Sequence, residues 1–422
     1  MEKVFTMVLL IAGLISGSLL SQIPQSAYVA NSLGQNLSMI NLENGSVIPD
    51  VLPLGLYTNF IKVEGQKAYV VNSGVNNIQV IDLAGLTTEG FIDLGSGTNP
   101  WAIDFINDSL AAVSLLFTNE VAIVNVNSRQ VVQNISVGSG PEGIRFYNGR
   151  IYVANSAYNG AGYDPGTVSV IDVNTFTVVN TLSVGINPQD LDVDSQGNLI
   201  VACSGDYVSI NSQIDFIDLS SGAVWNTITL PLTMQATSLR ISSQDKCYIG
   251  TFGFGVMVYD VASQSFERDD SNPLQGGPGI VFDAQNNAYI ADFFSDSVFV
   301  FSPVHQQIAA YQVGDGPVSI DLYIPETTGI DEDKISKAAD FTLFQNYPNP
   351  FNPATNIQYT LARRQYVILQ IYNVLGEEVA TLVNGFEAPG TYTVRWNAVN
   401  KNGLPVPGGI YFYRLKSDSR VE

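Results

Sequence analysis

Short apolar runs separated by turn residues fill the middle of the chain, and one five-residue run recurs along it. Its clearest copies are Ala27–Asn31, Ala68–Asn72, Ile151–Asn155 and Ala288–Asp292, and its weaker copies are Leu110–Ser114, Leu199–Cys203 and Cys247–Thr251. The second residues of these copies are residues 28, 69, 111, 152, 200, 248 and 289, so the spacings are 41, 42, 41, 48, 48 and 41. Seven copies at a nearly constant period predict a repeat architecture.

Each copy lies among three further strand patterns. A short apolar strand such as Ala102–Phe105 precedes it, a run such as Ile78–Asp82 follows it, and a fourth run such as Val178–Leu182 comes next. Four short strands per repeat are typical of a propeller blade. No stretch shows a 3.6-residue period over the length of a helix. We therefore expect an all-β protein in which residues 21–323 form a seven-bladed β-propeller.

The last strand pattern indicates how the ring closes. Pro317–Tyr323 has the pattern of one more innermost strand without a blade of its own, while the first copy begins at Ala27 with no room for an innermost strand before it. We expect this tail strand to complete the first blade. Closing the loop of nearly 300 residues between the first copy and this tail strand costs roughly 5 kcal/mol of chain entropy. Burial of Val318, Ile320 and Leu322 returns about 1.5–3 kcal/mol each, so closure is favourable.

The C-terminal part of the chain has a different pattern. Residues 324–340 include Pro325 and a charged cluster, which are typical of a linker. Three prolines within Asn346–Pro353 impose extended or turn geometry. Five alternating strands follow, at Ile357–Leu361, Val367–Tyr372, Glu378–Leu382, Thr391–Trp396 and Ile410–Leu415. We expect residues 341–422 to form a small Ig-like sandwich.

The N-terminus and the charge balance indicate the compartment. Lys3 precedes an apolar run that is shorter than the ~20 residues of a membrane span. Ser16-Gly17-Ser18 has the small-x-small form of a cleavage site. We expect residues 1–20 to be a secretory signal peptide and the protein to have no stable membrane span; an uncleaved anchor is the alternative. The net charge of −21 disfavours nucleic acid and anionic membranes as partners.

Histidine and cysteine are scarce. The single histidine, His305, argues against histidine-based triads and multi-histidine metal sites, and we expect it in solvent at an outer turn. Cys203 and Cys247 are too few for a disulfide framework. They fall at different heights on adjacent blades, so we expect free thiols.

The repeats over residues 27–323 resemble the YVTN and NHL families of seven-bladed β-propellers. This resemblance implies the fold and leaves the function open, because propellers host binding, scaffolding and catalysis alike.

The C-terminal module is similar to the C-terminal sorting domain (Por family) of the type IX secretion system. The matching segments are the proline-rich opening, Ile371–Val379, Tyr392–Trp396 and Gly408–Leu415. The resemblance implies a bacterial protein that enters the periplasm on a Sec signal. Type IX machinery would then recognise residues 341–422 and deliver the protein to the cell surface or the medium. An ordinary Ig-like accessory domain is the alternative, since we expect no basic final strand after Leu415.

Candidate ligand contacts gather at one mouth of the expected propeller. The loops that enter the innermost strands share a face with the loops between the second and third strands, and the 48-residue spacings lengthen two of the latter. The candidate ligand-binding residues are Asn59, Trp101, Glu142, Gln189 and Asp292 from the repeat alignment, and Tyr158, Tyr163 and Tyr207 from the lengthened loops. An aromatic mouth with few charges suits stacking on sugar or gripping a peptide. The alternative is that the rings pack under their own loops.

We expect a secreted or surface-displayed binding module for an extracellular carbohydrate or protein ligand, with no catalytic residues, metal ligands or cofactor. Two alternatives stay open. In the first, a metal-dependent lactonase or lyase uses Glu142 and asparagine oxygens to hold calcium. Glu142 and Asp292 fall on blades three apart, so their pairing as catalytic carboxylates is doubtful. In the second, the propeller only spaces or assembles surface proteins.

Overall fold

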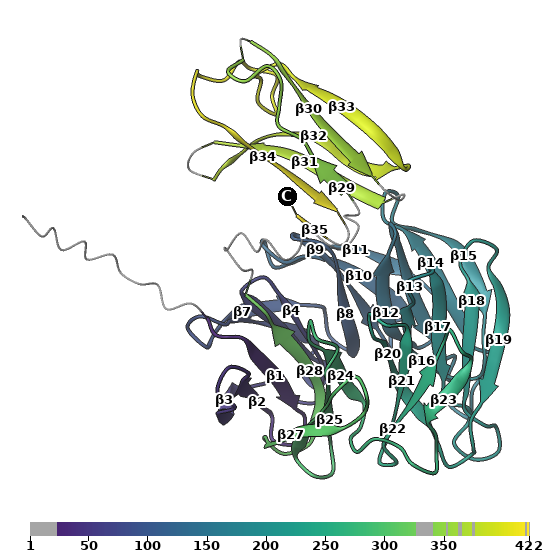
Figure 1. Ribbon diagram of the computed structural model, residues 1–422. Helices are drawn as coiled ribbons and strands as arrows, with labels where there is room; N and C mark the ends of the chain where they lie inside the picture. Colours follow the sequence, from purple (N-terminus) through teal and green to yellow (C-terminus); the bar gives the residue numbers. More distant parts are fainter. Residues whose placement is uncertain are drawn as a thin grey trace, which may run out of the picture.

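The computed structural model describes residues 23–325, 341–351, 353–361, 365–373, 376–417 and 420–421. Within them the chain consists of β-strands joined by turns, with one 3-10 turn, η1 (Ser73–Val75). The expected signal peptide and nearly all of the expected linker lie outside the described residues. Residues 23–325 and residues 341–421 form separate sets of sheets (Figure 1).

Residues 23–325 form seven four-stranded sheets. The first contains β28 (Pro317–Tyr323), β1 (Ser26–Asn31), β2 (Asn36–Asn41) and β3 (Val47–Pro53). The second contains β4 (Thr58–Glu64), β5 (Lys67–Asn72), β6 (Asn77–Asp82) and β7 (Thr87–Asp93). The third contains β8 (Pro100–Asn107), β9 (Leu110–Leu115), β10 (Glu120–Asn125) and β11 (Gln130–Ser136).

The remaining four sheets of this region repeat the same order. The fourth contains β12 (Pro141–Tyr147), β13 (Arg150–Asn155), β14 (Thr167–Asp172) and β15 (Thr177–Ser183). The fifth contains β16 (Pro188–Val193), β17 (Asn198–Cys203), β18 (Gln213–Asp218) and β19 (Ala223–Thr229). The sixth contains β20 (Ala236–Ile241), β21 (Lys246–Thr251), β22 (Val256–Asp260) and β23 (Ser265–Arg268). The seventh contains β24 (Gly279–Phe282), β25 (Ala288–Asp292), β26 (Ser297–Phe301) and β27 (Gln307–Gln312).

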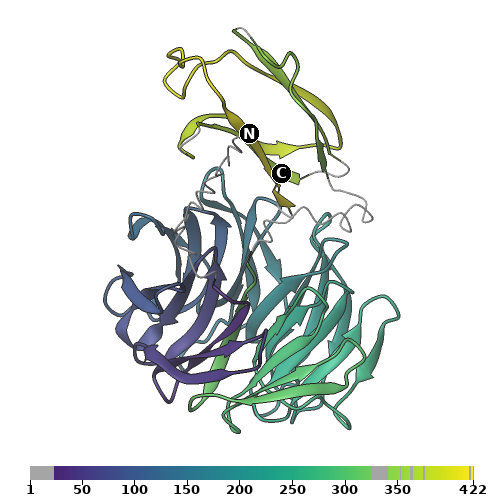
Figure 2. The same cartoon turned by 60° about the vertical axis from the view of Figure 1, so that its left-hand side comes forward.

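The sheets follow one another around a closed ring. The innermost strands β4, β8, β12, β16, β20, β24 and β28 each contact the next one, and β28 contacts β4 again. Figures 1 and 2 show the sheets side by side around a common centre. The region is therefore all-β and propeller-like.

Strand β28 closes the ring. It pairs antiparallel with β1, from Ser26 opposite Tyr323 to Asn31 opposite Pro317. Its buried Ile320 packs in a cluster that also holds Ala27 of β1. The prediction that Pro317–Tyr323 completes the first sheet is confirmed. The two ends of the region are thus held in one sheet, and the ring is locked by backbone hydrogen bonds.

The hydrophobic core is divided into layers between neighbouring sheets. Each pair of neighbours shares a cluster of buried apolar side chains, including the pair formed by the seventh and first sheets. Between the second and third sheets, the rings of Tyr69 and Phe105 meet edge to face with centroids 4.9 Å apart. Because successive side chains of a strand point to opposite faces, a strand buried on both faces is apolar almost throughout.

The strand register corrects the expected alignment of the third repeat by one residue. Ala112 of β9 lies opposite Asp104, just as Tyr69 of β5 lies opposite Lys62. The third copy of the repeat is therefore Ala111–Leu115. This shift matters for the candidate site, because it fixes which side chains of β8 share a level with those of the other innermost strands.

Residues 341–421 form two further sheets. The three-stranded sheet contains β29 (Phe341–Leu343), β30 (Thr355–Leu361) and β33 (Gly390–Trp396), and the four-stranded sheet contains β32 (Glu378–Glu387), β31 (Gln365–Tyr372), β34 (Phe412–Ser417) and β35 (Arg420–Val421). One buried cluster joins them, with Ile357 and Trp396 from the first sheet and Leu369 and Leu415 from the second. The module is thus two sheets around one core. The two-residue strand β35 pairs with β34, so a short strand does follow Leu415.

This C-terminal module contacts hairpins of the ring. Lys416 of β34 forms an ion pair with Asp108, in the turn between β8 and β9. The ring of Phe386 lies against Gly149, in the turn between β12 and β13, where a Cβ atom would collide with it. These turns join the first and second strands of their sheets, so they lie at the opposite end from the loops that join second and third strands.

Candidate functional site

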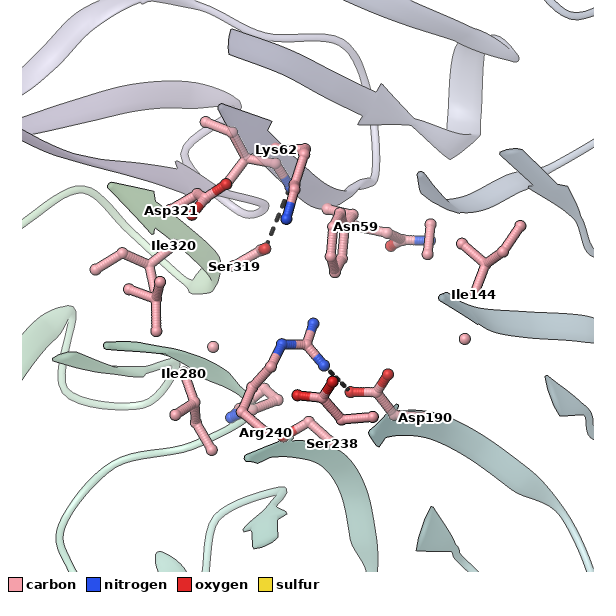
Figure 3. A pocket seen from close by; sticks show the side chains of 18 of the residues that line it. Asn59, Lys62, Ile144, Asp190, Ser238, Arg240, Ile280, Ser319, Ile320 and Asp321 are labelled. Atoms are coloured by element: carbon pink, nitrogen blue, oxygen red, sulfur yellow. Dashed lines mark hydrogen bonds and ion pairs between the residues drawn. The ribbon is translucent and has the colours of Figure 1, made fainter. Parts of the chain in front are cut away.

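The innermost strands surround a central cavity of about 520 Å³. All seven innermost strands contribute residues to its lining, and Figure 3 shows side chains converging on it from every side. Of the eight candidate residues, Asn59, Trp101 and Gln189 line this cavity. Asn59 is held in place because its Nδ2 donates to Ser73 Oγ at 2.6 Å.

Charged side chains of alternating sign form one level of the cavity wall. The register places seven equivalent positions at this level, and in ring order they are Lys62, Asp104, Arg145, Asp192, Arg240, Val281 and Asp321. A ring of seven cannot alternate perfectly, and the neutral Val281 takes the odd place. We call this level the charged ring.

The charged ring ties neighbouring sheets together. Arg145 and Asp192 form an ion pair at 2.8 Å, and the Lys62–Asp104 pair is longer, at 3.8 Å. The aspartates also accept hydrogen bonds from backbone N–H groups of the next innermost strand, as in Phe146 N to Asp104 at 2.7 Å and Ile241 N to Asp192 at 3.0 Å. The nearby Asp192 carboxylate raises the pKa of Arg145 further above its ordinary value. Hydrogen bonds to charged groups are stronger than neutral ones, so this level stabilises the ring.

Arg240 also narrows the cavity. Its guanidinium pairs with Asp190 at 2.7 Å and lies 5.7 Å from the centroid of the Phe60 ring, on a strand that is not adjacent in the ring. Figure 3 shows Arg240 pointing into the middle of the cavity with Asp190 beside it. Through this cation–π contact, the Arg240 side chain lies across the central axis of the ring of sheets.

Sequence reasoning missed the charged ring. The signal was present, since a charged residue follows an apolar one in six of the seven innermost strands. The charged positions lie three residues after the mouth positions Asn59, Trp101 and Glu142, and the sequence analysis considered only the mouth.

The three candidate tyrosines come together above the fourth and fifth sheets. Tyr158 and Tyr163 lie in the loop between β13 and β14, and Tyr207 lies in the loop between β17 and β18. The centroids of Tyr158 and Tyr163 are 5.3 Å apart, and those of Tyr163 and Tyr207 are 6.1 Å apart. Gln189 Nε2 donates to the Tyr207 hydroxyl at 2.6 Å. We call these four residues the tyrosine site.

Glu142 is buried near the start of β12 and does not open onto the mouth as expected. Its side chain is buried, and its Oε2 has no hydrogen-bond partner among the described residues. Burial raises the pKa of Glu142 to about 8, while a hydrogen bond from Ser156 lowers it. The repeat alignment places Glu142 level with Asn59, Trp101 and Gln189, but it cannot show that this side chain is buried with Ser156 as its hydrogen-bond donor.

The charge of Glu142 acts on the rings above it. It contributes to the raised pKa of both Tyr163, which reaches about 12, and Tyr207, although burial of the two phenols is the larger cause.

Asp292 is not brought to the tyrosine site. It ends β25 in the seventh sheet, where its Oδ1 accepts a hydrogen bond from Phe294 N at 3.1 Å. Glu142 belongs to the fourth sheet, so the structure does not pair the two acids. Among the described residues, no group of three or more His, Cys, Asp or Glu side chains could hold a metal ion.

At one end of the ring, the loops expose apolar side chains and carry no lysine or arginine. Each loop between a second and a third strand carries an apolar side chain that is 41–76% exposed: Leu33, Val75, Phe117, Tyr158, Val208, Phe254 and Phe294. These loops and the loops that enter the innermost strands contain no lysine or arginine, but they contain Asp164, Asp206, Asp269, Asp270, Asp296 and Asp315. We call this end the loop face; the C-terminal module contacts the opposite end.

The expected solvation of His305 was wrong. The side chain is 7% exposed, and its ring lies 6.0 Å from that of Tyr248, with Glu267 3.5 Å away. Burial lowers the pKa of His305, against the raising effect of Glu267. The turn that holds it, between β26 and β27, folds back onto the neighbouring sheet. Cys203 and Cys247 are free and buried, as expected.

The comparisons with known proteins agree with this architecture. Residues 345–422 match the family described as the secretion system C-terminal sorting domain. This match implies export through the type IX system to the cell surface or the medium. No helix in the described part of the chain is long and apolar enough to cross a bilayer.

Solved structures resemble the ring of sheets. Hydrazine synthase of Kuenenia stuttgartiensis is similar at 18% identity and a TM-score of 0.53, covering 62% of this chain and 88% of that chain. The computationally designed Ika8 protein aligns at 12% identity and a TM-score of 0.45, covering 62% and 89%. The first of these likenesses shows a propeller-like fold and nothing about activity. No curated relative matches the chain.

Proposed function

We propose that this chain is an exported seven-bladed β-propeller of the YVTN or NHL type that binds an extracellular carbohydrate or peptide through its loop face. Seven four-stranded sheets, closed by β28, support the blade number. In this proposal residues 1–20 act as a Sec signal peptide and residues 341–422 act as an Ig-like sorting module. The mature protein is displayed on the cell surface or released.

The loop face carries the proposal. Soluble proteins rarely expose many large apolar side chains at one end unless that end meets a partner. Here every loop between second and third strands exposes one large apolar side chain. The tyrosine site adds three aromatic rings, each with a hydroxyl group. Tyrosine rings supply contact area and a hydroxyl for hydrogen bonds, which suits recognition of sugars and of peptides.

A structural propeller is the second candidate. The charged ring and the contact of Arg240 with Phe60 fill the axis with side chains that already have partners. A protein that only spaces surface components would need such a rigid centre and no ligand. It would not need the exposed apolar loops, which is why we place binding first.

Binding of purified full-length protein to a glycan array and to a peptide array tests the proposal. A matched variant in which Phe117 and Phe294 are both changed to Ser keeps the ring but removes two exposed loop side chains. We expect hits on one array that weaken at least fivefold in this variant. No hit on either array, or hits that the variant leaves unchanged, would count against binding through the loop face and favour the structural candidate.

A further inference from the structure

The tyrosine site has features that a hydrophobic docking patch does not need. The buried carboxyl group of Glu142 accepts a hydrogen bond from Ser156, in the loop that also holds Tyr158 and Tyr163, and its Oε2 has no partner within the described chain. A buried acceptor without a partner is costly, because it has lost its water and gained no hydrogen bond. A ligand group that donates a charge-assisted hydrogen bond there would recover this cost.

The charges around the site point to the sign of that ligand group. Asp164 belongs to the same loop as Tyr158 and Tyr163, and Asp206 belongs to the same loop as Tyr207. No lysine or arginine occurs in any loop of the loop face, so the ligand meets no positive charge as it approaches. The basic residues of the neighbouring cavity wall are already paired, Arg145 with Asp192 and Arg240 with Asp190.

The rings suit a cation as well. A cation within about 6 Å of the centroid of an aromatic ring is attracted by its negative face. The three tyrosine centroids are separated by 5.3 and 6.1 Å, so one cation can lie within that range of two rings at once. Gln189 donates a hydrogen bond to the Tyr207 hydroxyl, which holds that ring in place.

We propose that the tyrosine site binds a primary ammonium group of the ligand, with Glu142 as its counter-ion and Tyr158, Tyr163 and Tyr207 as its aromatic walls. This inference rests on the proposed function, because it names the chemistry of the ligand at the same face. The ammonium can come from a lysine side chain or from an amino sugar, and the experiment separates these two sources.

Titration calorimetry on the full-length protein at 150 mM salt tests the proposal with four probes. Tetralysine amide and a glucosamine tetramer carry ammonium groups, and their fully N-acetylated forms are the neutral counterparts. We expect one charged probe to bind at least tenfold more tightly than its acetylated form. Which of the two binds identifies the source of the ammonium group.

Variants separate this site from general attraction to an acidic protein. Glu142→Gln and Tyr163→Ala should each weaken binding of the charged probe at least tenfold. Glu120→Gln, at the start of β10, removes one carboxylate elsewhere, and Phe91→Ala removes an exposed ring from the outer strand β7; both should bind within twofold of the parent protein. Equal losses in Glu142→Gln and Glu120→Gln would overturn the proposal.

The pH dependence gives a second readout. The groups that act on Glu142 are Ser156, Asp190, Tyr163 and Tyr207, and Asp190 is itself paired with Arg240. Glu142 must lose its proton to act as a counter-ion, so affinity for tetralysine amide should rise between pH 6 and 8 in the parent protein and stay flat in Glu142→Gln. Tetralysine stays charged throughout this range.

The outcomes distinguish this inference from the proposed function. If the acetylated probes bind as tightly as the charged ones and Tyr163→Ala weakens both, the ammonium proposal fails while binding at the loop face stands. If no probe binds and both arrays are silent, the ammonium proposal and the proposed function fail together.

Discussion

Arg145 and Asp192 show how single side chains hold the ring of sheets together. Asp192 is 3% exposed and combines the Arg145 ion pair with a backbone hydrogen bond from the next sheet, whereas Arg145 keeps one third of its side chain in solvent. A buried carboxylate that keeps its hydrogen bonds but loses its cation is left with uncompensated charge. Loss of the arginine therefore lowers the stability mainly because it leaves the buried Asp192 carboxylate without a cation.

Arg145→Met tests this dependence, because methionine keeps much of the aliphatic contact and removes the charge. We expect a loss of about 2 kcal/mol in the free energy of unfolding. Lys67→Met, at the more exposed Lys67–Glu89 pair, is the control and should cost less than about 1 kcal/mol. Urea unfolding of the full chain measures both, and equal losses would contradict a structural role for the charged ring.

Glu142 has the opposite effect on stability. Its folded pKa, about 8, lies above the ordinary glutamate value of 4.5, so between these values the folded state holds a proton that the unfolded state has released. Stability then falls as pH rises through this window. Each pKa unit is worth about 1.4 kcal/mol.

Glu142→Gln removes this penalty. The variant should match the parent protein near pH 4 and exceed it by a few kcal/mol near pH 8, with the difference growing in between. Thermal or urea unfolding at several pH values measures the difference. A variant that is less stable than the parent at pH 8 would show that the carboxylate has a partner in the folded protein.

At the scale of elements, the repeat predicted the strands well because each strand is short, apolar and bounded by turn residues. Pairing between β1 and β28 could also be predicted, since one strand was missing at one end and one was left over at the other. Exact registers could not be predicted. The second strand of the third repeat was misplaced by one residue, and the burial of Glu142 depends on packing that the repeat pattern does not encode.

Two truncations test the role of β28. A chain that ends after Tyr323 keeps the closing strand, so it should unfold in one cooperative transition close to that of the full-length ring. A chain that ends after Gly316 loses β28, exposes an edge of β1 and uncovers the cluster around Ala27. Exposed edges invite pairing with other chains. We expect aggregation or loss of the transition, measured by size-exclusion chromatography and circular dichroism; equal behaviour of the two would refute closure by β28.

For the whole molecule, the two ends of the ring differ. The loop face exposes apolar and acidic side chains, while the opposite hairpins contact the C-terminal module through Asp108 and Gly149. The sorting module and the proposed ligand site therefore lie at different ends of the ring. Removal of the C-terminal module leaves the proposed ligand site untouched, which separates the two functions experimentally.

Deletion of residues 345–422 should stop export and leave the ring folded. Residues 345–422 match the sorting domain, and the ring has its own closing strand and its own cores. In a bacterium with a type IX system, we expect the full chain on the surface or in the medium and the deletion variant in the periplasm. Fractionation and immunoblotting measure this, and a periplasmic reporter fused to residues 324–422 is the reciprocal test. Lys416→Ala, which breaks the contact with Asp108, is the control for the geometry between the two modules and should be exported normally. A deletion variant that reaches the medium would show that residues 345–422 are not needed for sorting.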